Sequence, residues 1–293
     1  MPFLDMNFLV LAHPGDELAL RVYLTLRARH GAVQAKLVSA DELALAVKWS
    51  HAIDTDGITS EVVLHDGTVL DLFGIGAVFN RLQFTPMPHF AGSRAADREY
   101  AMMEMHALWL SWLSSLPCPV INKATPRGIG APEFGEVEWL WLAGRAGLPV
   151  RGYHLSTNPR LFSSPGFVAF QPLDARGGLN HRSAVDRIIL GQKPALFLEP
   201  LSGEAQQMIV VGDTVLGALA GLYGDKLRSL ARAVNCELLQ VNFQRAEVNG
   251  AGSLGEWKAS YLTAFVNVHD RPVVDAVVSL LENYAENGGG VST

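Results

Sequence analysis

Apolar and polar positions in the first part of the chain alternate between short apolar runs and amphipathic stretches. The apolar run at 6–11 predicts a buried strand, and 15–30 carries leucines and a valine at helical spacing before Gly31. A second run at 33–38 predicts the next strand, and the Ser-Ala-Asp-Glu sequence at 39–42 is a capping box that opens a short helix. This strand–helix–strand–helix order is typical of a parallel sheet with helices on its faces.

The same spacing of apolar residues predicts the remaining strands and helices of the first half of the chain. A His-Asp-Gly turn separates two short strands, which indicates a β-hairpin. A long helix rich in Met, Leu and Trp ends at a pair of prolines. The predicted strands are 60–64, 68–72, 76–81 and 119–122, and the predicted helices are 95–116 and 132–145.

The second half has a different pattern of predicted elements, because its strands are separated by turns rather than by long helices. We expect an α+β unit with an antiparallel sheet. Gly147 and Pro149 follow the helix at 132–145, so we place a domain boundary near residue 150, between domains 1–150 and 151–293. The predicted strands are 166–173, 195–200, 207–211, 215–219, 237–243 and 257–268, and the predicted helices are 183–190, 225–234 and 272–284.

Composition and charge exclude several classes of function. The 293 residues are 49% hydrophobic and 18% charged, which is enough to bury a sizeable core. The net charge is -6 with no basic stripe, so we expect no nucleic-acid partner. We expect neither a membrane span nor a signal peptide, and hence a cytoplasmic protein. The two cysteines are expected to be reduced and buried.

A series of motifs then follows in order along the chain. Asn122 precedes a helix that ends in Gly-Leu-Pro149, and 167–173 (Phe-Val-Ala-Phe-Gln-Pro-Leu) precedes a glycine pair. The stretch 195–203 resembles a hinge, and 207–218 a hairpin with Val-Val-Gly-Asp in its middle. Two later strands end in Val-Asn and Phe-Val-Asn. This order resembles the ATP-grasp superfamily, in particular its glutamate-ligase and peptide-maturase branch.

The resemblance implies a fold and a set of binding positions. It implies an α/β fold, with an N-terminal parallel-sheet domain of the pre-ATP-grasp type followed by an α+β ATP-grasp-like domain with an antiparallel sheet. It implies ATP and Mg²⁺ as cofactors and a cleft between the domains. The implied cofactor-binding residues are Gln171, Gly177, Gly178, Glu199, Leu201 and Asn267, and the implied metal positions are Asn242 and Asn267.

This sequence departs from the family pattern at most of the charged positions. Where the family has a lysine on its strand, this sequence has Gln171. Where the family has an arginine that opens the hairpin, this sequence has Gln206 or Gln207. The metal-binding aspartate and glutamate fall on Asn242 and Phe265. Magnesium is held by carboxylates and phosphates, so an amide and a phenyl ring are poor substitutes. We therefore expect ATP and Mg²⁺ to bind only weakly.

Two further patterns carry chemistry. Arg81 ends a predicted parallel strand, where ligands of such sheets bind, and we expect it to hold a substrate carboxylate or phosphate, or else to bond loop carbonyls. The Ala-His-Pro-Gly-Asp-Glu sequence at 12–17 resembles the zinc motif of the N-acetylglucosamine-type deacetylases, with His13 and Asp16 as ligands. Gly15 replaces one family aspartate, and the second ligand cluster is incomplete, so we expect no zinc.

Three hypotheses for function follow. The first is a degenerate ATP-grasp-like protein that binds a peptide, small molecule or nucleotide in an interdomain cleft and assists a biosynthetic partner protein. The second is an active ATP-dependent carboxylate–amine ligase with a non-standard site. The third is a zinc-dependent hydrolase that uses His13 and Asp16. Tryptophan and methionine at 102–112 are expected to pack in the core or to form a homodimer face.

Overall fold

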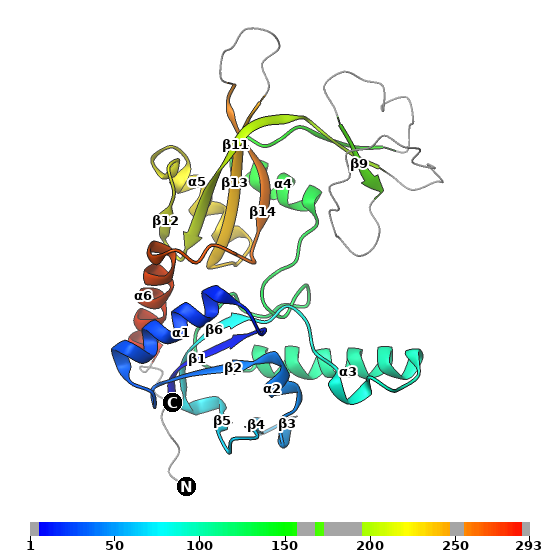
Figure 1. Ribbon diagram of the computed structural model, residues 1–293, viewed down its shortest axis with the longest axis vertical. Coiled ribbons are helices and arrows are strands. Elements are labelled where there is room, and N and C mark those ends of the chain that lie inside the picture. Colours follow the sequence, from blue (N-terminus) through cyan, green and yellow to red (C-terminus); the bar gives the residue numbers. More distant parts are fainter. Residues whose placement is uncertain (1–5, 157–167, 173–194, 247–254, 289–293) are drawn as a thin grey trace.

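The computed structural model describes residues 6–156, 168–172, 195–246 and 255–288, and its elements form a lower part around a parallel sheet and an upper part of antiparallel sheets (Figure 1). The helices are α1 (Glu17–His30), α2 (Ala40–Ala44), α3 (Ala95–Ser114), α4 (Glu136–Arg145), α5 (Ala220–Ala233) and α6 (Arg271–Gly288). The strands of the first half are β1 (Met6–Ala12), β2 (Ala35–Ser39), β3 (Lys48–Asp54), β4 (Gly57–Val63), β5 (Val69–Asp71), β6 (Ile75–Arg81) and β7 (Val120–Ile121). Those of the second half are β8 (Tyr153–Ser156), β9 (Val168–Pro172), β10 (Ala195–Leu198), β11 (Leu201–Val211), β12 (Thr214–Leu216), β13 (Leu238–Ala246) and β14 (Trp257–Thr263).

The parallel sheet has the strand order β2-β1-β6-β7, and every pair in it is parallel. Alternate residues of β1 point to opposite faces, as the period of a strand requires. Leu9 and Leu11 lie in the cluster with the end of α3, whereas Phe8 and Val10 lie in the cluster with α1 and α6. Both faces are therefore covered by helices, and the predicted mixed α/β class is confirmed.

The hairpin next to this sheet is larger than predicted. The expected pair of strands is present as β4 and β5, but β3 also pairs with β4 along its whole length, from Lys48 opposite Val63 to Asp54 opposite Gly57. The sequence pattern missed β3 because most of it faces solvent. Only Trp49 packs into the core from this strand, against Trp109 and Trp112.

The second half forms two antiparallel sheets. One has the order β8-β10-β9 and the other β12-β11-β13-β14. The strand β8 was not predicted, and β14 ends at Thr263 rather than at 268. The predicted helix at 183–190 and the glycines Gly177 and Gly178 lie outside the described residues. The connection between β10 and β11 links the two sheets, because β10 belongs to one and β11 to the other.

Two helices pack on the sheet that is distant from them in sequence. α4 lies before residue 150, yet Trp139 and Leu140 are buried against the large antiparallel sheet. α6 ends the described chain, yet Val277 and Leu281 pack on β1 and β6 (Figure 1). The boundary near residue 150 stays a prediction, and these helices bind the two parts together by apolar burial across it.

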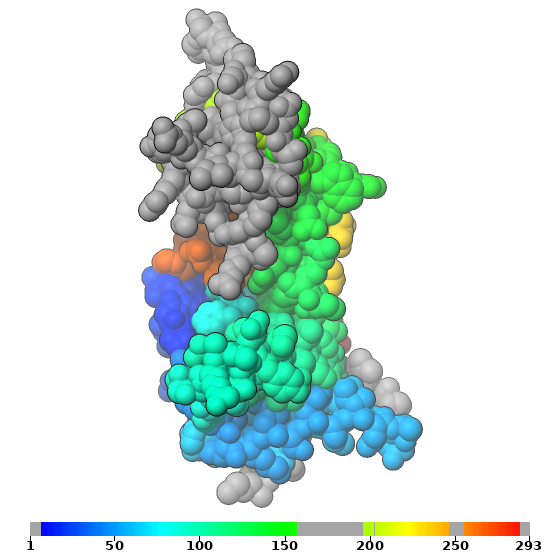
Figure 2. Space-filling view, turned by 90° about the vertical axis from the view of Figure 1, so that its right-hand side faces the viewer, coloured from blue at the N-terminus to red at the C-terminus, as the bar shows by residue number. Residues whose placement is uncertain are grey.

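The long helix α3 divides into a buried and an exposed part. Trp109 and Trp112 are buried in the core beneath the hairpin, whereas Tyr100, Met102 and Met103 are exposed. Figure 2 shows α3, in green-cyan, on the outer surface of this part of the molecule. The tryptophans of this stretch are therefore core residues, and the homodimer face stays a prediction. No helix in the described part of the chain is long and apolar enough to cross a membrane.

A buried asparagine joins the two parts at the centre of the molecule. Asn122 follows β7 with φ of 57°, a left-handed conformation that asparagine tolerates better than most residues. Its Nδ2 donates to the carbonyl oxygens of Leu238 and Ala264 at 3.0 and 3.1 Å, and its Oδ1 accepts from the N–H of Leu238 at 2.9 Å. The backbone N–H of Asn122 donates to the Glu237 carboxylate at 3.0 Å. One side chain thus pairs backbone groups of β13 and of the segment after β14.

We predict that Asn122→Ala destabilises the protein by about 3 kcal/mol or more, because buried backbone groups of Leu238 and Ala264 lose their partners and each such loss costs about 1–3 kcal/mol. Asn122→Gly is the matched control. It loses the same hydrogen bonds but tolerates the positive φ, so it should be less destabilised than the alanine variant by about 1 kcal/mol. Urea unfolding of the three proteins measures both differences. Equal stability of Asn122→Ala and the unmodified protein would contradict the central role of Asn122.

Candidate functional site

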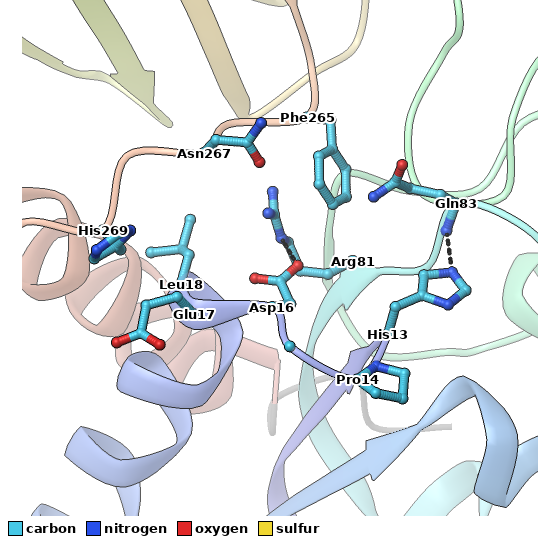
Figure 3. A pocket seen from close by; sticks show the side chains of 11 residues that line it. His13, Pro14, Asp16, Glu17, Leu18, Arg81, Gln83, Phe265, Asn267 and His269 are labelled. Atoms are coloured by element: carbon cyan, nitrogen blue, oxygen red, sulfur yellow. Dashed lines mark hydrogen bonds and ion pairs between the residues drawn. The ribbon is translucent and has the colours of Figure 1, made fainter.

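A pocket opens where the carboxyl ends of β1 and β6 meet the segment that follows β14. Its volume is about 350 Å³, which is within the range of small-ligand sites. The turn between β1 and α1, the end of β6 and the segment after β14 all contribute to it (Figure 3). The lining residues are His13, Pro14, Gly15, Asp16, Glu17, Leu18, Arg81, Gln83, Phe265, Asn267 and His269.

A buried ion pair forms the floor of this pocket. Asp16 is the N-cap of α1, and its Oδ1 accepts a hydrogen bond from the N–H of Ala19 at 3.0 Å. Its Oδ2 accepts from Nε of Arg81 at 2.9 Å, and the two side chains are 6% and 2% exposed. Burial lowers the pKa of Arg81, and the adjacent Asp16 carboxylate opposes that shift. The pair thus joins the start of α1 to the end of β6.

The other side of the Arg81 guanidinium is covered by an aromatic ring. Cζ of Arg81 lies 3.8 Å from the centroid of the Phe265 ring and 5.9 Å from that of Phe79. Figure 3 shows Arg81 pointing from β6 toward Asn267 and the Phe265 ring, with Asp16 beside it. Nη1 of Arg81 is buried and has no hydrogen-bond partner among the described residues. The guanidinium therefore holds an unused donor next to the pocket.

His13 holds the loop after β6 in place. Its Nε2 accepts from the backbone N–H groups of Gln83 and Phe84 at 3.0 and 3.3 Å, and its ring stacks on Phe84 with centroids 4.0 Å apart. An acceptor nitrogen requires the neutral imidazole, with its proton on Nδ1. Burial lowers the pKa of His13, against the opposing charges of Asp41 and Asp16, which agrees with that neutral form.

These contacts bear on the predicted zinc motif. The lone pair of His13 Nε2 is engaged by backbone N–H groups, and both carboxylate oxygens of Asp16 accept hydrogen bonds. In the described part of the chain, no group of three or more His, Cys, Asp or Glu side chains is arranged to hold a metal ion. The geometry of His13 and Asp16 favours a structural role for both.

A second polar cluster lies at the connection between the two antiparallel sheets. Nζ of Lys258, on β14, donates to both carboxylate oxygens of Glu199 at 2.7 and 2.8 Å. The N–H of Gly152 donates to the same carboxylate at 2.8 Å, and Nε of Arg151 donates to the backbone carbonyl of Glu199. Burial alone would raise the pKa of Glu199, but these hydrogen bonds outweigh it and the pKa is lowered. Leu201 begins β11 directly after this cluster.

The structure places the predicted site residues in different locations. Arg81 and Asn267 lie together in the pocket, whereas Glu199 and Leu201 are not among its lining residues. Asn242 lies on β13, where its Oδ1 accepts from Nε2 of Gln240 at 2.9 Å. Gln171 lies on β9, and the positions of its side-chain atoms are outside what the structure describes.

Sequence reasoning missed two partners in these sites. Lys258 was read only as part of a strand, and the signal that could have found it is that it is the single charged residue of β14. The contact between Phe265 and Arg81 joins residues far apart in sequence, and the pattern of apolar and polar residues around either one does not predict it.

We predict that His13 makes stability fall as the pH falls below its unperturbed pKa of 6.5. Its pKa is lowered in the folded protein, so between the two values the unfolded chain binds more protons and is favoured. His13→Gln keeps an acceptor and cannot be protonated, so part of this loss should disappear. Urea unfolding at about pH 7.5 and about pH 5.5 measures it.

His51→Gln is the matched control for this prediction, because burial also lowers the pKa of His51, which lies away from the pocket on β3. The His51 variant should keep the share of the pH dependence that comes from His13. If His13→Gln unfolds with the full pH dependence of the unmodified protein, the assignment of His13 as a neutral acceptor is wrong.

Comparison with known proteins gives matches in structure and not in sequence. The chain matches no protein-family model and no curated protein sequence. Among solved structures, it is similar to the macrocyclase MdnC bound with precursor peptide MdnA from Microcystis aeruginosa MRC, with TM-score 0.72 and 15% identity over 95% of this chain and 100% of that chain.

Two further solved structures are similar over nearly the whole chain. One is a RiPP-associated ATP-grasp ligase of Chryseobacterium gregarium in complex with ADP and a leader and core peptide, with TM-score 0.68 and 13% identity over 95% of this chain and 97% of that chain. The other is the ATP-grasp ligase PsnB complexed with precursor peptide PsnA2 and AMPPNP, with TM-score 0.66 and 18% identity over 95% and 99%. With the parallel sheet and the two antiparallel sheets, these similarities show that the chain has the fold of the ATP-grasp ligases.

Proposed function

We propose that this chain is a degenerate ATP-grasp-like protein. It binds a peptide in the cleft at Arg81, by which we mean the pocket described above, and it holds ATP and Mg²⁺ only weakly. The observation that carries the proposal is the contact between Phe265 and Arg81. By the resemblance to the ATP-grasp pattern, Phe265 occupies the position of a metal-binding glutamate. An aromatic ring that lies on a guanidinium offers a cation no ligand atom.

The charges of the pocket support weak metal binding. Asp16 is buried, but its carboxylate is already paired with Arg81 and with the N-terminus of α1. The Oδ1 of Asn242 accepts from Gln240, and a neutral amide is a poor ligand for Mg²⁺ in the absence of carboxylates. Glu17 lies at the pocket and is exposed, so a cation that it attracts stays in contact with water. We assign Asn242 and Asn267 as weak remnants of the metal position.

The cleft supports a peptide as the ligand. The solved structures with this fold include proteins described as bound to precursor peptides. In this chain the pocket offers the Arg81 guanidinium and the Asn267 amide as polar groups, beside the apolar ring of Phe265. We assign Arg81 as the substrate-binding residue, and Gln171, Glu199 and Leu201 as the remaining nucleotide contacts. We place the protein in the cytoplasm, as a partner protein of a biosynthetic enzyme.

One observation favours a second candidate, the active carboxylate–amine ligase. Lys258 places an ammonium group between the two antiparallel sheets, where it pairs with Glu199. The family lysine is absent at Gln171, and Lys258 is a cation that could neutralise phosphate in its place if it left Glu199. This candidate differs from the first in a measurable way, because it requires tight binding of magnesium-ATP.

We predict that magnesium-ATP binds no more tightly than the high micromolar range, with little turnover. Each lost charged hydrogen bond weakens binding by about 1.5–3 kcal/mol, and about 1.4 kcal/mol is a factor of ten. Calorimetric titration with and without Mg²⁺ measures the affinity, and phosphate release measures turnover. Low-micromolar, magnesium-dependent binding would favour the active ligase, and its loss in Lys258→Met would identify Lys258 as the substitute.

We predict that the triple variant Gln171→Lys, Asn242→Asp and Phe265→Glu binds magnesium-ATP at least about tenfold more tightly than the unmodified protein, because it restores three charged positions. Phe265→Glu alone should bring no gain, since without the second carboxylate that helps to hold Mg²⁺ the new one would pair with Arg81 beside it. Titration of both variants, after thermal unfolding has shown that each folds, makes the comparison. A triple variant with unchanged affinity would show that these positions are not the nucleotide site.

A further inference from the structure

Arg81 offers the pocket more hydrogen-bond donors than the protein uses. A guanidinium carries five N–H donors. Nε donates to Asp16, and Nη1 is enclosed without a partner in the described part of the chain. The side chain is 2% exposed, so bulk water does not supply the missing acceptor. An unpaired buried donor on a charged group is unfavourable, and an acceptor from a ligand would relieve it.

The Phe265 ring is a cover over these donors. It is half-buried and lies 3.8 Å from Cζ of Arg81. It belongs to the stretch 264–270, which follows β14 and forms neither helix nor strand. The ring can therefore rotate about its side-chain bonds without breaking a sheet, while Asn122 holds the backbone at Ala264. A ligand that takes up the enclosed face of the guanidinium has to displace this ring, which we call the Phe265 cover.

The surroundings select the charge of the ligand. Among the eleven lining residues, Arg81 is the only arginine or lysine. Asp16 already compensates much of its charge, and Glu17 at the rim is itself paired with Arg21 at 2.9 Å. A phosphate carries up to two negative charges, more than one largely compensated guanidinium can balance, whereas a carboxylate carries one and matches the planar fork of a guanidinium. The Asn267 amide adds a neutral donor.

We propose that Arg81 beneath the Phe265 cover is a metal-independent receptor for a carboxylate of the bound peptide, either a Glu or Asp side chain or a free carboxyl terminus. The inference rests on the proposed function for its peptide ligand. It adds that the carboxylate binds the protein directly, without nucleotide or magnesium, once the ring has moved aside. The position aligned with a metal-binding glutamate thereby serves an anion instead of a cation.

The test is a nuclear magnetic resonance titration of the ¹⁵N-labelled full chain in EDTA without nucleotide, which follows the Nε–H signal of Arg81. The probes are acetyl-Gly-Glu-Gly-amide, its Gln counterpart, acetyl-Gly-Gly-Gly with a free carboxyl terminus, and inorganic phosphate. We expect the signal to shift with a carboxylate probe and not with the Gln peptide. The first and third probes distinguish the two sources of the carboxylate.

Variants separate the receptor from the fold. Phe265→Ala removes the cover and should tighten carboxylate binding by about threefold to tenfold, the strength of a cation–π contact. Arg81→Lys should weaken binding at least about tenfold, because the planar fork is lost. Arg127→Gln, which removes an exposed arginine paired with Glu138, is the matched control and should bind as the unmodified protein does.

Three results would overturn the proposal: no shift of the Arg81 signal with either carboxylate probe, tighter binding of phosphate than of carboxylate, or unchanged carboxylate affinity in Phe265→Ala. If Arg81→Lys does not fold, the Phe265 variant still decides the question. The titration contains no nucleotide, so its failure is distinct from that of the proposed function. Tight magnesium-ATP binding would contradict the degenerate site and leave the receptor intact.

Discussion

The ion pair between Asp16 and Arg81 is the interaction on which the geometry of the site depends. It joins the N-terminus of α1 to the last residue of β6, and both side chains are buried. A buried pair of this kind contributes little net stability, because desolvation offsets most of the attraction, but loss of one partner leaves an uncompensated charge. Its role is therefore positional. It fixes the direction of the guanidinium and so determines what the cleft can bind.

The segment after β14 completes the site from the opposite side. Phe265 and Asn267 line the pocket, and Asn122 ties the backbone of this segment and of β13 to the end of the parallel sheet. The packing of α4 on the antiparallel sheet and of α6 on the parallel sheet holds the two parts in the same relation. The cleft is thus built from hydrogen bonds at its centre and apolar burial at its flanks.

In both polar clusters the charged groups are paired within the protein itself. Lys258 and Glu199 satisfy each other at the connection between the antiparallel sheets, and Arg81 and Asp16 do so in the cleft. Each charge has a partner in the protein itself, so neither cluster needs a nucleotide or a metal to compensate it. A phenyl ring over Arg81 is compatible with such a site, because a cation and an aromatic face attract.

The sequence by itself determined the local elements whose apolar period is strong. The β1-α1-β2-α2 order, the capping box at Ser39 and the predicted strand that became β6 all follow from neighbours in the chain. The sequence also singled out Arg81, because it ends a parallel strand. It missed β3, since a solvent-exposed strand has no apolar alternation to reveal it.

Only the tertiary structure decided the partners. Asp16 and Arg81 are 65 positions apart, and Arg81 and Phe265 are farther still, so no local period connects them. The same holds for Lys258 with Glu199 and for α6 on the parallel sheet. Local periodicity reports whether a residue is buried, whereas the identity of the neighbour depends on how distant elements pack. The chemistry of this cleft arises from such distant pairs, so it became visible only in three dimensions.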